Sequence, residues 1–71
     1  MKNIYIDKNG KKITREILEN LIDFTREEYD EKNKGYLDFD IFLDNVVKAT
    51  LSENGTLEDA IYIANDAFEK L

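Results

Sequence analysis

The chain has 71 residues, which is enough for one small domain with a limited hydrophobic core. It contains no cysteine and no histidine, which excludes disulfides, zinc sites and the catalytic mechanisms that rely on those side chains. Sixteen acidic residues against ten basic ones give a net charge of −6, which argues against nucleic acid or an anionic membrane as a direct partner. We expect a single domain over residues 1–71.

The N-terminal residues predict a β-hairpin. Apolar and polar residues alternate in NIYID, and the chain reaches the pair Asn9-Gly10 before the pattern resumes at Ile13. Asn-Gly is the strongest short signal for a two-residue type I′ turn, because both central residues of that turn need a positive φ. The sequence therefore predicts a hairpin over 3–14, with strands at 3–7 and 11–14.

A long first helix is predicted next, because apolar residues recur at helical spacing from Ile17 to Tyr29. Thr14 is expected to cap its start, and Gly35 offers the left-handed conformation that ends helices. This pattern predicts one helix over 15–33.

Two further helices complete the predicted fold. The apolar spacing that begins at Phe39 predicts a second helix over 38–51, followed by a turn that Gly55 supplies. Thr56-Leu-Glu-Asp is close to a capping box and predicts a third helix over 56–70. The expected fold is mainly α, of the α+β class: a short N-terminal β-hairpin followed by three packed helices in a single small domain.

The segment from Asp30 to Ile41 resembles the calcium-binding loop of the EF-hand family. With Asp30 as position 1, Gly35 falls at the turn position 6 and Asp38 at the ligand position 9. The resemblance implies Asp30, the backbone of Tyr36 and Asp38 as ligands. Positions 3 and 5 are lysines, which have no acceptor atom, and Ile41 replaces the glutamate at position 12. We expect no metal ion here and keep a divergent or vestigial calcium-binding regulator as an alternative.

No arrangement of residues predicts catalysis or a cofactor. Ser52 is the only serine, and no base stands at a recognisable spacing from it. The three glycines lie in separate turns and form no phosphate-binding loop. Acidic residues near helix N-termini are explained by their interaction with the helix dipole. We therefore expect no enzyme.

The acidic body of the chain is the remaining functional signal. Residues 1–15 carry five bases against one acid, a net charge of +4, whereas residues 16–71 carry fifteen acids against five bases, a net charge of −10. Complementary charge speeds encounter with a basic surface and excludes wrong partners. The sequence predicts a non-enzymatic module that docks on a basic, nucleic-acid-binding type of surface of a partner protein.

The residues predicted to contact that partner lie around the end of the first helix and the start of the second, and they include one tyrosine as an aromatic anchor. They are Asp23, Glu27, Glu28, Asp30, Glu31, Tyr36, Asp38, Asp40 and Asp44. Tyr62 is a second candidate anchor.

The composition is rich in Lys, Asn and Ile, and it resembles that of small accessory proteins of phages and mobile elements. We therefore expect an inhibitor or regulator that competes with nucleic acid, in the style of anti-CRISPR proteins. A self-associating structural protein, in which the basic hairpin of one copy docks on the acidic body of another, is a further alternative. Because no apolar run approaches the roughly 18 residues needed to span a bilayer, we expect no membrane contact and a cytoplasmic location.

Overall fold

The computed structural model describes residues 5–34 and 37–71. It contains an antiparallel hairpin of two short strands, β1 (Tyr5–Ile6) and β2 (Lys12–Ile13). Four helices follow in chain order: α1 (Arg15–Leu21), α2 (Arg26–Asn33), α3 (Phe39–Ser52) and α4 (Leu57–Glu69). The predicted fold class, a mainly helical small domain with an N-terminal hairpin, is confirmed.

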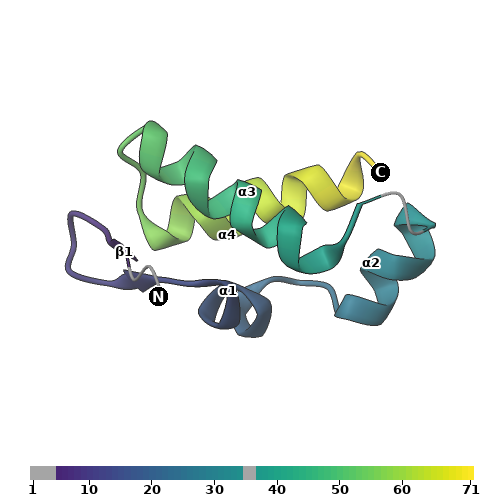
Figure 1. The fold of residues 1–71 in the computed structure, drawn as a ribbon. Coiled ribbons are helices and arrows are strands. Elements are labelled where there is room, and N and C mark those ends of the chain that lie inside the picture. Colours follow the sequence, from purple (N-terminus) through teal and green to yellow (C-terminus); the bar gives the residue numbers. More distant parts are fainter. Residues whose placement is uncertain (1–4, 35–36) are drawn as a thin grey trace.

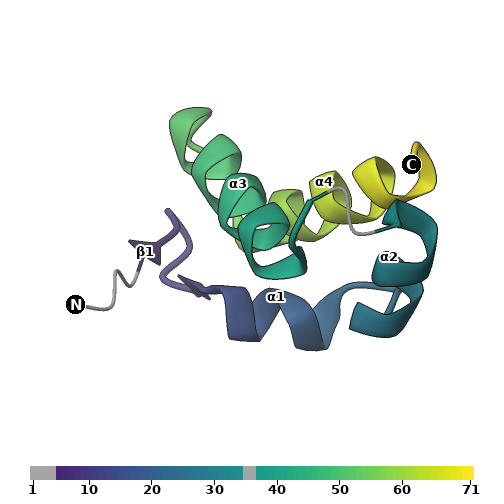
Figure 2. The same cartoon turned by 45° about the vertical axis from the view of Figure 1, so that its right-hand side comes forward.

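The helices form two layers (Figure 1). α3 and α4 pack against each other in the upper layer of that view, and α1 and α2 lie beneath them, one after the other. The hairpin and α2 lie at opposite ends of the molecule, which is also visible in the turned view (Figure 2). The single core lies between the two layers.

The hairpin closes with a three-residue loop, and the predicted type I′ turn is wrong. Tyr5 pairs with Ile13, and the Asp7 backbone N–H then donates to the Lys11 carbonyl at 2.8 Å. Gly10 has a φ of 80°, whereas Asn9 does not have the positive φ that a type I′ turn requires. A three-residue loop with glycine in the left-handed region is the next most common way to join two strands.

The predicted helix over 15–33 is also wrong, because the chain leaves the helical conformation between Leu21 and Arg26. Ile22 is extended and ends α1, and Thr25 is extended and caps α2. Thr25 and Glu28 form a complete capping box, in which each side chain accepts a hydrogen bond from the other residue's backbone N–H. The interruption therefore has its own local stabilisation.

The interruption places Phe24 in the core. Phe24 is 5% exposed, and its ring stacks on that of Phe68 in α4 with the centroids 4.1 Å apart. Its ring also lies 6.2 to 6.5 Å from the rings of Tyr29, Phe39 and Phe42. Aromatic pairs at such distances contribute beyond simple burial. In an unbroken helix, Phe24 would not have the backbone conformation that places its ring in the core.

The ends of α2 and α3 use different residues from those predicted. α2 ends at Lys34, which has the left-handed conformation with a φ of 57°, and Gly35, expected in that role, lies outside the described residues. After α3, the positive φ belongs to Asn54 and not to Gly55. Gly55 is needed for another reason, because a Cβ atom there would lie 3.0 Å from the Thr50 side chain.

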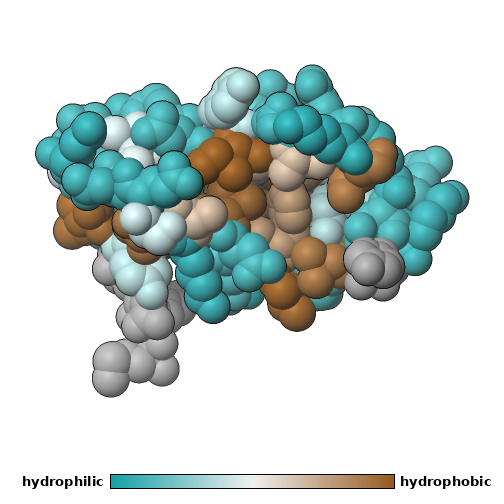
Figure 3. All heavy atoms as spheres, turned by 90° about the horizontal axis from the view of Figure 1, so that it is seen from above, coloured by the Kyte–Doolittle hydropathy of each residue, from teal (hydrophilic) through white to brown (hydrophobic). Residues whose placement is uncertain are grey.

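The helices α3 and α4 lie close to the ranges in which the sequence predicts them, 38–51 and 56–70. Asp38 caps α3, and Thr56 and Asp59 form the capping box of α4. The small residues Ala60 and Ala64 are fully buried where α4 approaches its neighbours. Seen from above, apolar side chains reach the surface over these two helices between hydrophilic flanks (Figure 3).

A nearly buried carboxylate attaches the hairpin to α4. Asp7 is only 7% exposed, and its Oδ1 accepts hydrogen bonds from the N–H groups of Asn9 and Lys11 within the loop. Its Oδ2 accepts a hydrogen bond from the Leu57 N–H at 2.8 Å, in the first turn of α4. These N–H groups, with Leu57 contributing most, hold the pKa of Asp7 below its ordinary value. Lys11 adds an exposed ion pair with Glu58 at 2.9 Å.

Candidate docking surface on α1 and α2

The outer side of α2 carries three exposed acidic residues. Glu27, Asp30 and Glu31 are exposed, and the described part of the chain offers their side chains neither a hydrogen bond nor an ion pair. Residues three and four apart lie on the same side of a helix. The three carboxylates therefore form one surface, which we call the α2 acidic face.

The inner side of α2 fixes this helix against α3. Tyr29 is fully buried, and its hydroxyl donates to the Leu37 carbonyl at 3.1 Å. The Asn33 side-chain amide donates to the same carbonyl at 2.8 Å. Burial, followed by the charges of Asp30 and Asp38, raises the pKa of Tyr29 above its ordinary value. The α2 acidic face is thus carried on a helix whose other side is anchored.

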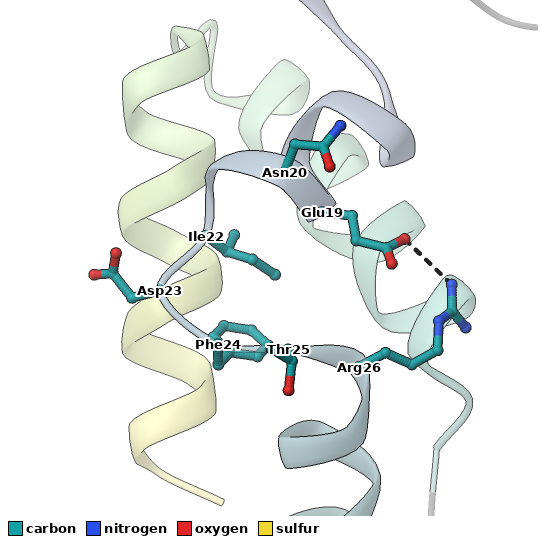
Figure 4. Close-up of a pocket in the computed structure, with 7 residues that line it drawn as sticks. All are labelled: Glu19, Asn20, Ile22, Asp23, Phe24, Thr25 and Arg26. Carbon is teal, nitrogen blue, oxygen red and sulfur yellow. Dashed lines mark hydrogen bonds and ion pairs between the residues drawn. The ribbon is translucent and has the colours of Figure 1, made fainter.

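A shallow hollow of about 340 Å³ lies at the joint between α1 and α2 (Figure 4). Ile22 and Phe24 give it apolar surface, and the Glu19–Arg26 ion pair and Asp23 lie on different sides of it. The hollow exists because the chain is extended here.

Asp23 is one of the predicted contact residues, and it has an internal bond. Its backbone N–H donates to the Asn65 side-chain oxygen at 2.9 Å, and the Asn65 amide donates to the Asp23 carboxylate at 3.2 Å. This pair joins the α1–α2 joint to α4. Asp23 is nevertheless exposed, so its carboxylate still contributes to the charge of the surface.

The predicted residues at the start of α3 are used in ion pairs within the chain. Arg26 donates to Asp40 at 3.0 Å, and its guanidinium lies 4.7 Å from the centre of the Phe39 ring. Arg15 lies 3.3 Å from Asp44 and 3.8 Å from Asp40. The hydrogen bond that Arg26 donates to Asp40 is the main reason why the pKa of Arg26 is raised. Asp40 and Asp44 therefore hold α1 and α2 against α3.

Two further predicted residues serve as helix caps. Glu28 belongs to the capping box of α2, and Asp38 accepts a hydrogen bond from the Asp40 N–H at the start of α3. Tyr36 lies outside the described residues. Tyr62, the second candidate anchor, is 70% exposed on α4.

The segment that resembles an EF-hand loop begins inside a helix. Asp30 belongs to the last two turns of α2, and Asp38 directs a carboxylate oxygen to the Asp40 N–H. Over residues 5–34 and 37–71, no three acidic side chains come together in a way that could hold a metal ion.

The sequence pattern did not reveal the residues that decide which acids are paired. Arg15 and Arg26 are the only arginines of the chain, and both bind carboxylates of α3. One signal was available. Both arginines, whose guanidinium groups can donate two hydrogen bonds at once, stand at the starts of helices. For Asp7, the signal was its place two residues before Asn9-Gly10, where aspartate commonly accepts loop N–H groups.

The chain matches no known protein family, no curated protein and no solved structure. In the part of the chain that the structure describes, no helix is long and apolar enough to cross a membrane.

Proposed function

We propose that this chain is a non-enzymatic protein-binding module that docks its α2 acidic face on a basic surface of a partner protein in the cytoplasm. The observation that carries the proposal is the contrast between two groups of acids. Asp40 and Asp44 have arginine partners within the chain, whereas Glu27, Asp30 and Glu31 are exposed and have no side-chain partner among the described residues.

Unpaired carboxylates of this kind are suited to bind a basic surface. No charge within the described part of the chain neutralises them, so their full charge can act on an external partner. Because they stand on an anchored helix, little conformational entropy is lost on binding. Basic surfaces of proteins commonly bind the phosphates of nucleic acid. A partner covered by the α2 acidic face would lose its access to nucleic acid, so we propose an inhibitor or regulator of the type used by phages and mobile elements.

The test is a matched pair of double variants. Glu27→Gln with Glu31→Gln removes two charges from the α2 acidic face, and Glu16→Gln with Glu69→Gln removes two exposed charges from α1 and α4. A partner is first captured from the source cell on the immobilised full chain, and its affinity is then measured with purified protein. We expect roughly tenfold weaker binding for the first variant, about 1.4 kcal/mol, and a change within about twofold for the second.

The salt dependence completes the test. Affinity of the unmodified chain should fall steadily between about 0.05 M and about 0.5 M salt, because exposed charges are screened over that range. Equal affinity at both ends of the range, or equal losses for the two double variants, would contradict the proposal.

A further inference from the structure

A second hollow lies at the turn between α3 and α4. This turn is at the end of the molecule away from α2 (Figures 1 and 2). It has a volume of about 270 Å³. One aromatic ring, one aliphatic side chain and two carboxylates line it together with a threonine and a glycine. The lining residues are Thr50, Glu53, Gly55, Asp59, Tyr62 and Ile63.

The hollow owes its shape to the tight reversal of the chain. The Gly55 N–H donates to the Thr50 carbonyl at 2.8 Å, so the chain turns back immediately beside the end of α3. A Cβ atom on Gly55 would lie 3.0 Å from Thr50 Cγ2 and 3.1 Å from Asp59 Oδ2. A residue with a Cβ atom would therefore be crowded at this turn, and glycine avoids that crowding.

Tyr62 forms a wall of this hollow and is 70% exposed, the largest exposed fraction among the large apolar or aromatic residues described. Ile63 beside it is half-buried and packs on the core, which fixes the backbone at this point of α4. An exposed tyrosine on a rigid helix offers a large contact area at low conformational cost, which is why tyrosine is favoured at binding sites.

The two carboxylates have acceptor capacity to spare. Asp59 accepts the Thr56 N–H through Oδ2, and its other oxygen has no partner among the described residues. Glu53 follows the end of α3, and its carboxylate likewise has no partner among residues 5–34 and 37–71. Thr50 is satisfied, since its hydroxyl donates to the Val46 carbonyl at 2.8 Å. The polar groups that remain open in the hollow are thus acceptors on acids.

We propose that this hollow binds the guanidinium group of an arginine side chain from a protein partner. A guanidinium is flat, so it can stack on the Tyr62 ring, and its forked N–H groups donate to carboxylates in pairs. The methylene stem of the arginine would lie against Ile63. This site shares no residue with the α2 acidic face, so it is a second contact point and does not depend on the first.

The probe for this site is a blocked arginine, N-acetyl-arginine N-methylamide, titrated into the full chain and followed by backbone amide NMR shifts. The reference is the corresponding citrulline derivative, which has the same shape and no charge. We expect saturable shifts confined to residues 50–63, with roughly tenfold weaker binding for citrulline because it cannot form charge-assisted hydrogen bonds. Equal binding of the two compounds, or shifts spread over the whole chain, would overturn the proposal.

Variants locate the binding energy. Tyr62→Ala and Glu53→Gln should each weaken arginine binding at least about threefold. Glu69→Gln removes the same charge as Glu53→Gln, but at an exposed position outside the hollow, and should leave binding unchanged. Both altered side chains are exposed, so the fold is expected to survive, and the amide spectrum of each variant verifies this directly. Unchanged arginine binding in a folded Tyr62→Ala variant would reject the site. Loss of partner binding by the α2 variants would leave this result untouched, so the two proposals succeed or fail separately.

Discussion

The two ends of the molecule use their charged residues in opposite ways. At the hairpin end, Asp7 is nearly buried and accepts N–H groups from its own loop and from Leu57 of α4. Lys11, beside it, forms an ion pair with Glu58. The charges of Asp7, Lys11 and Glu58 at this end hold elements of the same chain together.

At the α2 end, the attachment is made by apolar and neutral polar groups. Phe24 stacks on Phe68, and Tyr29 and Asn33 both donate to the Leu37 carbonyl. The carboxylates of the α2 acidic face stay outside this network. The comparison teaches that the surroundings of an acidic residue decide whether it serves as a structural acceptor, as a surface charge or, like Asp23, as both.

The largest effect is expected from removing the aromatic attachment of the α2 end. Phe24→Ala deletes a ring that is 5% exposed and contacts four other aromatic rings. Such substitutions cost about 3 to 5 kcal/mol in free energy of unfolding. Because a domain of this size has only a few kcal/mol in total, we expect urea denaturation followed by circular dichroism to show a largely unfolded variant.

Leu21→Ala is the matched control for Phe24→Ala. Leu21 ends α1 next to the joint and is 47% exposed. Its truncation should cost less than about 1 kcal/mol. Similar losses for the two variants would show that the joint does not bury Phe24.

The next effect is expected at the hairpin end. Asp7→Asn removes the negative charge and replaces one acceptor oxygen by a donor, which leaves at least one backbone N–H group without a partner. We expect a lower melting temperature than that of the unmodified chain. Asp30→Asn, the same chemical change at the α2 end, should leave the melting temperature nearly unchanged. Equal melting temperatures for the two variants would remove the distinction between the ends.

The pH dependence of stability should depend on the same carboxylate. Because the pKa of Asp7 is lower in the folded protein than in the unfolded chain, its contribution is complete above about pH 4 and is lost as pH falls through the folded-state value. The melting temperature of the unmodified chain should therefore exceed that of Asp7→Asn by a constant amount at neutral pH and by a shrinking amount below about pH 4. A difference that persists unchanged to about pH 2 would contradict this assignment.

A smaller effect is expected from the cap of α2. Thr25→Ala removes the hydroxyl that accepts the Glu28 N–H at 3.1 Å. Loss of an N-cap costs about 1 kcal/mol, which chemical denaturation can resolve. Thr25→Ser keeps the hydroxyl and should recover most of the loss. If serine recovers nothing, the methyl group and not the cap is responsible.

The smallest effect on stability is expected at the α2 acidic face. Glu27→Gln with Glu31→Gln alters exposed side chains that have no partner among the described residues. The free energy of unfolding should change by no more than about 0.5 kcal/mol, because relief of repulsion between neighbouring carboxylates opposes the loss of the interaction between Glu27 and the α2 dipole. A loss of more than about 1 kcal/mol in free energy of unfolding would show that these residues stabilise the fold, as Asp7 does at the hairpin end.

Local signals in the sequence were sufficient for the hairpin, α3 and α4. Their apolar spacing, the caps at Asp38 and Thr56, and Gly10 act over a few residues, so they can be read without knowing the rest of the chain. The joint between α1 and α2 was harder to predict. Thr25 and Glu28 carried a capping-box pattern, but the apolar spacing from Ile17 to Tyr29 fitted one unbroken helix equally well.

The sequence by itself determined the composition of the surface: an excess of acids, no histidine or cysteine, and a basic N-terminal segment. Only the tertiary structure decided where the chain breaks and which acids are available for binding. The partner that favours the break, Phe68, lies in α4, and Asp7 bonds to an N–H group 50 residues further along the chain. Such contacts depend on how the helices pack, and the local propensities of residues do not predict that packing.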